Sequence, residues 1–307
     1  MSASSPSLLA AARDAAGHQH YPQGALYMVA TPIGNLADIG LRALQVLALA
    51  DTVACEDTRH TATLLQGYGL HKPLLALHEH NEAEAAQAVV QRLQEGQRVV
   101  YVSDAGTPGV SDPGARLVSA VNAAGLRSVP IPGASSITAL LSVTGHSGWD
   151  GHFVFAGFLS PKATERQREV QQIGGDVRAC VLLEAPHRIE ALAKDLAVLG
   201  ERPVTVGREL TKQFEEIAQM PAQDVPAWLQ ASEHRRRGEF VLMVHPQAAD
   251  AADAGAIDAR TLRTLDLLMA ELPLKTAVRL CADITGHPRN ALYDAALARR
   301  KGGDSED

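Results

Sequence analysis

The feature that most constrains the fold of this chain is a regular alternation of short apolar runs with segments of helical period. Runs rich in Val, Ile and Leu are each followed by a helical pattern, five times in succession from residue 26 onward. Strand followed by helix, repeated in this way, requires crossover connections and predicts a mostly parallel sheet with helices on both faces. The predicted strands are 26–31, 51–55, 74–78, 97–103 and 127–131, and the predicted helices are 36–49, 58–68, 83–95, 114–124 and 136–144.

A second α/β pattern follows a break at residues 145–151, where glycine, serine and aspartate interrupt the apolar runs. We expect an N-terminal α/β domain at 25–146 and a second α/β domain at 151–246. The second domain has predicted strands at 153–159, 179–184, 204–208 and 240–245, and predicted helices at 162–173, 189–199 and 225–231.

The two ends of the chain differ from this body. Residues 1–24 lack an apolar core, so we expect a disordered tail there. An Ala- and Asp-rich run predicts a linker at 247–257. A small helical unit at 258–301 follows, with predicted helices at 260–272, 275–285 and 288–300.

Cysteine content and hydropathy exclude several classes of protein. Cys55, Cys180 and Cys281 are widely spaced and form no C-x-x-C pair, which argues against a disulfide scaffold or a structural zinc site. No window approaches the roughly 18 uninterrupted apolar residues of a membrane span. Arg13 and Asp14 interrupt the one apolar stretch near the N-terminus, so no secretory signal is expected. We therefore expect a soluble, cytoplasmic protein.

The charge distribution is uneven along the chain. The formal net charge is −7, which argues against a protein coated in basic surface for nucleic acid. Residues 256–303 nevertheless carry eight Lys or Arg against five acids. Any nucleic-acid contact is therefore expected to involve this C-terminal segment.

Three turns rich in small residues follow strands of the first predicted sheet, at 29–36, 102–114 and 131–136. Ligands of parallel sheets bind at the carboxyl ends of the strands, so these turns predict a binding site at one sheet edge. Neither the dinucleotide fingerprint G-x-G-x-x-G nor the P-loop pattern occurs. The aspartates of 102–114 suit a neutral or cationic ligand better than a phosphate. Alternatively, Asp112 caps one helix and Ser135 or Ser136 caps the next.

Charged side chains also follow strands in both predicted domains. The segments 183–188 and 207–212 indicate either a polar cleft or isolated surface ion pairs. The acids of 56–59 and the histidines His78 and His80 have residue types that bind metals, but a helix cap at Asp57 or Thr58 explains the first group at least as well. We expect no metal site.

Taken together, these stretches resemble the tetrapyrrole methylase superfamily and, within it, the branch that methylates ribosomal RNA of the small subunit. The resemblance runs in register from about residue 24 to residue 246. It departs from the usual pattern at Ala134, where the family commonly has Pro, and at Gly40, where it has Thr. The segments that carry the resemblance are 30–36, 56–59, 78–82, 103–114, 131–133, 184–188, 208–212 and 238–241.

The resemblance implies two α/β domains of the tetrapyrrole methylase type with the cofactor cleft between them, plus a small C-terminal domain of the helix-turn-helix type. The cofactor implied is S-adenosylmethionine, and the implied acceptor is the 2′-oxygen of a cytidine in the decoding region of 16S ribosomal RNA within the small ribosomal subunit. A homodimer is also implied. The candidate cofactor-binding residues are Pro32, Gly34, Asp104, Ala105, Gly106, Pro132, Gly133, Ala134 and Ser135.

The chemistry expected of such an enzyme is mainly alignment. A sulfonium methyl is already activated, so the acceptor oxygen must be held in line with it, within roughly 3–3.5 Å, and no metal is required. A ribose hydroxyl is a very weak acid, so a base or a cation near it should help. Lys212 is expected to supply the charge and one carboxylate to take the proton. The catalytic candidates are Glu56, Asp57, Glu184, Arg208 and Lys212.

The predicted RNA contacts lie in two places. Residues 275–293 read as helix, short turn and helix, which is either a helix-turn-helix or a hairpin that only packs on the body. The run 235–237 is either a phosphate contact or a solvated turn. The candidate RNA-binding residues are Arg235, Arg236, Arg237, Lys275, Arg279 and Arg289.

Aromatic residues make up only 4% of the chain, which favours recognition of RNA through shape and backbone over base stacking. Two other functions remain open at this point. One is a small-molecule methylase of the same fold, and the other is a regulator that binds nucleic acid without catalysis.

Overall fold

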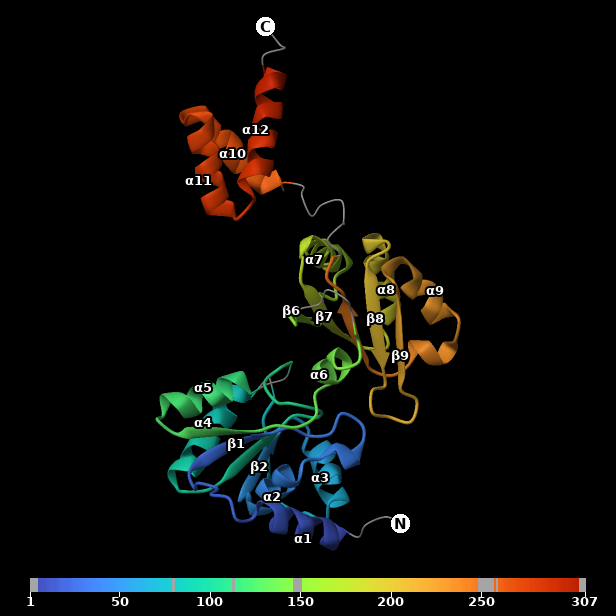
Figure 1. Cartoon of the computed structure of the whole chain (residues 1–307). Coiled ribbons are helices and arrows are strands. Elements are labelled where there is room, and N and C mark those ends of the chain that lie inside the picture. The colour runs from blue at the N-terminus through green and yellow to red at the C-terminus, as the bar shows by residue number, and fades with distance from the viewer. Residues whose placement is uncertain are drawn as a thin grey trace. The chain divides into compact units, whose positions relative to one another are not determined.

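The computed structural model in Figure 1 describes residues 5–78, 81–111, 114–145, 151–247, 257 and 259–303. The chain divides into two compact units, Met1–Gln247 and Ala248–Asp307. Both predicted α/β domains therefore fall within the first unit. Of the predicted linker at 247–257, only residues 247 and 257 lie in the described part of the chain.

The first sheet is parallel throughout, as predicted, with strand order β3-β2-β4-β1-β5. Its strands are β1 (Ala25–Val29), β2 (Thr52–Cys55), β3 (Leu74–Ala76), β4 (Val99–Val102) and β5 (Arg127–Ile131). The helices of this half are α2 (Leu41–Leu49), α3 (Thr58–Gly67), α4 (Glu82–Gln94), α5 (Ala115–Ala123) and α6 (Ser136–Leu141), with a short 3-10 turn at Leu36–Asp38.

Both faces of this sheet are buried, which explains why its strands read as continuous apolar runs. Leu26 and Tyr27 are adjacent in β1 and point to opposite faces, where each joins a separate core cluster. Helices α4 and α5 cover one face and α2 and α3 the other (Figure 1). Burial of each large apolar side chain contributes about 1.5–3 kcal/mol.

The N-terminal segment differs from its prediction. The sequence predicts disorder over 1–24, but Ser5–Ala16 forms a helix, α1, packed against α2. Leu8 and Ala12 lie one turn apart and pack with Leu44 and Tyr68 in a small core cluster. The prediction fails because small alanines at helical spacing form a face flat enough to pack closely on another helix, although they carry little hydropathy of their own.

The second sheet is mixed, with order β6-β7-β10-β8-β9. Of the paired neighbours in this sheet as described, β6 and β7 are parallel, β10 runs antiparallel to β7 and β8, and β9 is antiparallel to β8. The strands are β6 (Phe153–Gly157), β7 (Ala179–Glu184), β8 (Pro203–Arg208), β9 (Glu216–Pro221) and β10 (Phe240–Val244). The helices are α7 (Ala163–Gly175), α8 (Ile189–Leu196) and α9 (Val225–Gln230), with 3-10 turns at Ala197–Leu199, Ala222–Asp224 and Glu233–Arg236.

Helix α6 links the two halves of the first unit. Helices α7, α8 and α9 pack on one face of the second sheet. On its other face, Ile137 and Leu140 of α6 pack with Val181, Val241 and Met243. A helix that the sequence assigns to the first domain therefore completes the core of the second.

The C-terminal unit consists, in its described part, of α10 (Ala259–Glu271), α11 (Leu274–Thr285) and α12 (Arg289–Gly303). Leu265, Cys281 and Leu292 form its core, one from each helix. Gly286 ends α11 with a left-handed φ of 76°. The three predicted helices are present, and α11, turn and α12 have the succession of a helix-turn-helix. Among the helices that the structure describes, none is long and apolar enough to cross a membrane.

Candidate functional site

The three turns predicted to form a site converge at the carboxyl edge of the first sheet. Thr31 and Gly106 are joined by two backbone hydrogen bonds: the amide of Thr31 donates to the Gly106 carbonyl at 2.9 Å, and the amide of Gly106 donates to the Thr31 carbonyl at 3.1 Å. The Ala30 amide donates to the Ile131 carbonyl at 3.1 Å. The Thr107 hydroxyl donates to the Ala134 carbonyl at 3.1 Å. The turns after β1, β4 and β5 thus form one structure.

Two glycines make this close approach possible. Gly106 has φ +81°, and a Cβ there would lie 3.2 Å from Ile33 Cγ2. A Cβ at Gly133 would lie 2.9 Å from Ala30 Cβ. A larger residue at either position would push the turns apart, so the spacing of the backbone depends on glycine here.

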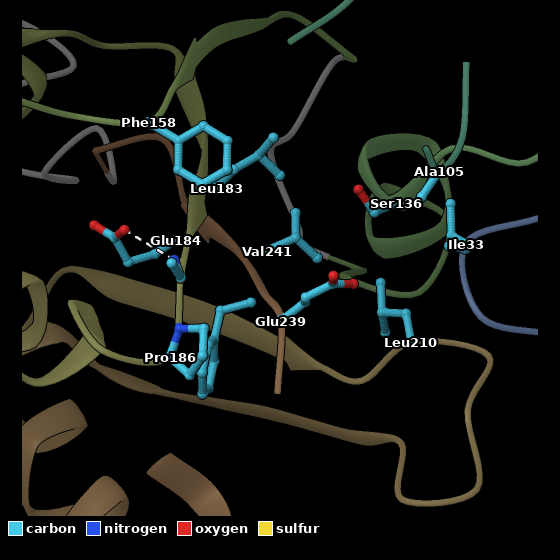
Figure 2. A pocket seen from close by; sticks show the side chains of 12 residues that line it. Ile33, Ala105, Ser136, Phe158, Leu183, Glu184, Pro186, Leu210, Glu239 and Val241 are labelled. Carbon is cyan, nitrogen blue, oxygen red and sulfur yellow. Dashed lines mark hydrogen bonds between the residues drawn. The ribbon is translucent and has the colours of Figure 1, made fainter. Parts of the chain in front are cut away.

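Three adjoining cavities border these turns, and all of them are lined by Ile33 and Ala105. The first, which we call the apolar cavity, has a volume of about 360 Å³. Figure 2 shows Ile33, Ala105 and Ser136 on one side of it and Phe158 and Leu183 on the other. It therefore lies between the turns of the first sheet and the strand ends of the second.

Polar and charged side chains form part of the lining of the other two cavities. The polar cavity, of about 690 Å³, is lined by Pro32, Ile33, Gly34, Leu36, Asp57, Arg59, His60, Thr63, Leu64, Asp104, Ala105, Lys212 and Glu239. The loop cavity, of about 200 Å³, is lined by Ile33, Glu56, Ser103, Asp104, Ala105, Gly106, Thr107, Val110, Ser111, Ser135, Ser136, Ile137 and Leu183. Asp104 lines both, so its carboxylate lies where the two meet.

The acids after β2 and β4 are held side by side. The Asp104 amide donates to Glu56 Oε1 at 3.4 Å, and the Asp57 amide donates to Asp104 Oδ1 at 3.3 Å. Asp57 also caps α3, because its Oδ1 accepts from the amides of Arg59 and His60 at 2.8 and 3.3 Å. The Arg59 guanidinium and these amides lower the pKa of Asp57 to about 2. Asp57 is thus a poor proton acceptor, and the helix-cap alternative describes it well.

Lys212 reaches the polar cavity from the second half of the unit. Its stem lies on the turn after β1, since a Cβ at Gly34 would be 2.4 Å from Lys212 Cγ. The ammonium donates to Glu209 Oε1 at 2.8 Å and to Glu239 Oε2 at 3.1 Å. Burial alone would lower the pKa of Lys212, but the hydrogen bonds to the two carboxylates outweigh it and the pKa is raised. Lys212 is therefore a fixed cation at this wall.

Two predicted catalytic residues point elsewhere, and the first is Arg208. Its Nη1 and Nη2 donate to the carbonyls of Arg237 and Phe214 at 3.1 and 3.0 Å, and it lines none of the three cavities. Gly207 faces Leu140 of α6, so the alternation of the strand turns the next side chain away from the cleft. Arg208 holds the loop between β8 and β9, and its position does not favour the predicted catalytic role.

Glu184 is the second predicted catalytic residue that points away from the cleft. It is 2% exposed, accepts a hydrogen bond from the Ala185 amide at 2.9 Å and pairs with Arg188 Nε at 3.1 Å. Although it lines the apolar cavity, Figure 2 shows its carboxylate on the side away from Ile33 and Ala105. It orders the loop after β7, and its position does not favour the predicted catalytic role.

Most residues of the turn after β5 pack behind the site and do not form the walls of its three cavities. Ala134 packs with the core cluster of α6, Gly133 backs onto Ala30, and Pro132 is exposed. Ser135 occupies the cap position of α6 without a side-chain cap bond and lines the loop cavity. Of the four candidates in this turn, only Ser135 is in a cavity wall.

Several cavity residues were missed by the sequence analysis, including Phe158, Leu210 and Glu239. Phe158 follows the last residue of β6, so the strand-end rule that found the other turns applies to it as well. Glu239 precedes β10. It could not be found in this way, because the amino end of β10 reaches the cleft only through its antiparallel orientation.

The candidate RNA contacts near residue 235 are partly engaged within the protein. Arg235 Nε donates to Glu216 Oε1 at 2.8 Å, and its guanidinium lies over the Trp228 ring at 4.5 Å from the centroid. Arg236 pairs with Glu190 at 3.7 Å. Arg237 is exposed. Arg235 therefore contributes to the fold, and the alternative of a structural turn is favoured for it.

The candidates in the C-terminal unit are on its surface. Lys275 and Arg279 are exposed and one turn apart on α11. Arg289 is also exposed and pairs with Asp283 at 3.0 Å.

No metal cluster occurs among the residues that the structure describes, but these do not include His80 or Glu79. Asp112, the other predicted helix cap, also lies outside the described residues.

Comparison with known proteins agrees with this architecture. A family profile described as Tetrapyrrole (Corrin/Porphyrin) Methylases matches residues 25–226, and one described as RsmI C-terminal HTH domain matches residues 255–300. Ribosomal RNA small subunit methyltransferase I of Escherichia coli O157:H7 is 46% identical over 91% of this chain and 96% of its own length. The protein of the same name from Pseudomonas aeruginosa is 46% identical over 90% and 98%.

Solved structures show the same fold at low identity. The methyltransferase CobJ superposes with a TM-score of 0.55 at 18% identity, covering 73% of this chain and 94% of that one. The cobalt precorrin-4 methyltransferase CbiF gives a TM-score of 0.54 at 17% identity, covering 73% and 98%.

Proposed function

Since the chain belongs to the tetrapyrrole methylase family and, within it, to the ribosomal RNA small subunit methyltransferase I family, we propose that it transfers a methyl group from S-adenosylmethionine to the 2′-oxygen of a cytidine in 16S ribosomal RNA. One observation carries the proposal: three small-residue turns meet beside cavities that combine an apolar wall, carboxylates and a fixed ammonium.

The apolar cavity and the loop cavity fit the cofactor. Aliphatic and aromatic side chains suit a nucleobase, and the acids Glu56 and Asp104 suit a ligand that carries positive charge. Gly106 and Gly133 let backbone approach whatever lies between the turns. S-adenosylmethionine supplies a methyl group already activated on sulfur. Within this region Asp104, Ala105 and Ser135 are the residues that would hold it.

The polar cavity fits the acceptor. Here the task of the chain is to hold a ribose hydroxyl in line with the methyl group, within about 3–3.5 Å. The Lys212 ammonium would stabilise negative charge that develops on the 2′-oxygen. Asp57 lines this cavity but is too weak a base, with a pKa of about 2, whereas Glu56 lines the adjoining loop cavity, on the side where we place the cofactor.

We place the RNA contacts on exposed cations outside the cavities, chiefly Lys275 and Arg279 of α11 and Arg237. Such contacts bind phosphates without reading sequence, so an assembled small subunit should be a better substrate than a short oligonucleotide. Because ribosomal subunits are cytoplasmic particles, we also place the protein in the cytoplasm.

A homodimer completes the proposal. Val143 and Phe153 are apolar side chains that are 56% and 40% exposed, and we place the interface at these residues. Sedimentation equilibrium of the full chain should give twice the mass of 32.5 kDa, and a monomer at micromolar concentration would contradict the dimer.

The function is tested with S-adenosylmethionine carrying a labelled methyl group and small subunits that lack the modification. We expect label at one cytidine 2′-oxygen of 16S RNA, and much slower labelling of a naked cytidine oligonucleotide. Absence of label in the RNA would overturn the proposal.

A shortened chain, residues 1–247, separates this function from a small-molecule methylase. The first unit is compact by itself and holds all three cavities. We expect the shortened chain to bind cofactor but to label subunits poorly. A methylase that acts on a small acid would retain its full activity.

A further inference from the structure

The loop that follows β8 has an unusual backbone. Glu209 and Thr211 have φ values of 50° and 66°, in the left-handed region that residues with a Cβ seldom adopt. Such conformations persist where the surrounding structure holds them, and they concentrate at functional sites. The loop also carries Lys212, whose ammonium lines the polar cavity.

The Glu209 carboxylate lies where this loop meets the start of β10. Its Oε1 accepts from the Glu239 amide at 3.0 Å and from Lys212 Nζ at 2.8 Å, and the Glu209 amide donates to the Glu239 carbonyl at 3.0 Å. Gly238 leaves room for it, since a Cβ there would lie 2.4 Å from Glu209 Cγ and the φ of Gly238 is +89°. Each of these features favours one position for the carboxylate.

Lys212 is consequently held on three sides. Its stem lies on Gly34, and its ammonium contacts Glu209 and Glu239. The Glu209 side chain is 20% exposed and that of Glu239 is 74% exposed, so Glu209 is the inner partner. An ammonium has three protons. Two are taken by these carboxylates, and within the described part of the chain the third meets no acceptor.

The loop also has contacts that do not involve the Glu209 carboxylate. Glu215 Oε2 accepts from the Thr211 amide at 2.6 Å, and Arg208 binds the Phe214 carbonyl at 3.0 Å. These contacts hold the two ends of the loop independently of Lys212. The ion pair differs from them because its lysine lines the polar cavity.

We propose that Glu209 is a positioning residue, whose carboxylate fixes the Lys212 ammonium on the wall of the polar cavity and leaves its third proton directed at the acceptor. This inference rests on the function proposed above. In that reaction a mobile lysine would have to be ordered in each turnover, whereas the lysine held by Glu209 is already in place.

The test compares Glu209→Gln and Glu209→Ala with the matched control Glu215→Gln, a carboxylate of the same loop that does not contact Lys212. The Gln variant keeps an acceptor for the Glu239 amide but loses the charge. For methylation of small subunits we expect kcat to fall about tenfold in Glu209→Gln and about a hundredfold in Glu209→Ala, by analogy with the loss of one stabilising donor. The KM for S-adenosylmethionine should stay within about twofold in both.

A pH profile distinguishes positioning from a purely structural role. Without the carboxylate, Lys212 loses its proton more readily, so the basic limb of kcat should move to lower pH in Glu209→Gln. The control should keep the wild-type rate and profile. Calorimetric binding of S-adenosylmethionine, measured without RNA, reports whether the cleft is intact in each variant.

Each outcome has a separate meaning. If the wild-type chain does not label subunit RNA, the proposed function fails before this inference is reached. If Lys212→Ala is slow but Glu209→Gln has the wild-type rate and pH profile, the positioning role is wrong and the function stands. If Glu209→Gln loses cofactor binding in proportion to kcat with an unmoved profile, Glu209 serves the fold, and the inference is again wrong.

Discussion

The two sheets of the first unit present their strand ends to the cleft in different ways. In the first sheet all strands are parallel, so every carboxyl end lies at one edge and the turns after β1, β4 and β5 meet. In the second sheet β9 and β10 run against their neighbours, so the amino ends of these two strands lie at the same edge as the carboxyl ends of β6, β7 and β8. Charged residues at strand ends therefore mark the site reliably only in the first sheet.

The comparison is seen most clearly in three residues at or beyond the ends of β7 and β8. Glu184 and Arg208 end their strands but turn away from the cleft, whereas Lys212 lies four residues beyond β8 and reaches the polar cavity. Position along the strand decides the direction of Glu184 and Arg208, because alternate side chains point to opposite faces, whereas the loop after β8 decides that of Lys212.

Lys212→Ala is the sharpest test of this difference and should have the largest effect. We expect kcat for subunit methylation to fall about 100- to 1,000-fold, the range for loss of one group that stabilises a developing oxyanion. Single-turnover transfer of label at saturating cofactor measures it. A rate within threefold of wild type would mean that the ammonium does not act on the acceptor.

Arg208→Ala should affect stability instead. The residue is 6% exposed and its guanidinium donates to two carbonyls, and hydrogen bonds to charged groups contribute about 1.5–3 kcal/mol each. We therefore expect a loss of about 2–4 kcal/mol in the free energy of unfolding, measured in urea. Activity per folded molecule should change little. A large fall in kcat at unchanged stability would instead show that Arg208 is catalytic.

Gly133→Ala tests the close contact between turns in the first sheet. The new Cβ would lie 2.9 Å from Ala30 Cβ, an overpacking that costs about 1–3 kcal/mol. We expect about tenfold weaker binding of S-adenosylmethionine by calorimetry, which corresponds to about 1.4 kcal/mol. The control is Gly40→Ala, where the nearest atom is 4.0 Å away and φ is −72°. Equal effects in the two variants would contradict the packing argument.

Asp57→Asn should have the smallest effect, because Asn caps a helix about as well as Asp. The pKa of Asp57 is lowered to about 2, so the stability that it gives to the folded state is present above its unfolded pKa of about 3.9 and is lost as pH falls through about 2. In this variant, the acidic side of the pH dependence of kcat for methylation should not move. A shifted limb would identify Asp57 as the base.

The fold of the first sheet was predictable because its strands are buried on both faces and read as apolar runs. Strand β9 was missed because it is an edge strand, and Gln219 interrupts the apolar residues of its short sequence Glu216–Pro221. Helix α1 was missed because alanines pack closely without a strong hydropathy signal. Both misses involve elements whose stability comes from a neighbour and not from their own composition.

The candidate site was predictable to the level of the turns and no further. Sequence places Asp57 and Lys212 near the cleft, but whether a side chain caps a helix or lines a cavity depends on contacts between distant segments. Glu209 illustrates this limit, because its partner Glu239 is 30 residues away and its space depends on Gly238.

The packing of α6 has a consequence for protein engineering. Ile137 and Leu140 precede the sequence break at residue 145, yet they belong to the interior of the second sheet. A chimera that exchanges the second half with that of another methylase must therefore bring residues 136–141 along. A junction placed at the break itself would pack this chain's α6 against a foreign sheet face, and the mismatched core should lower the stability of the hybrid.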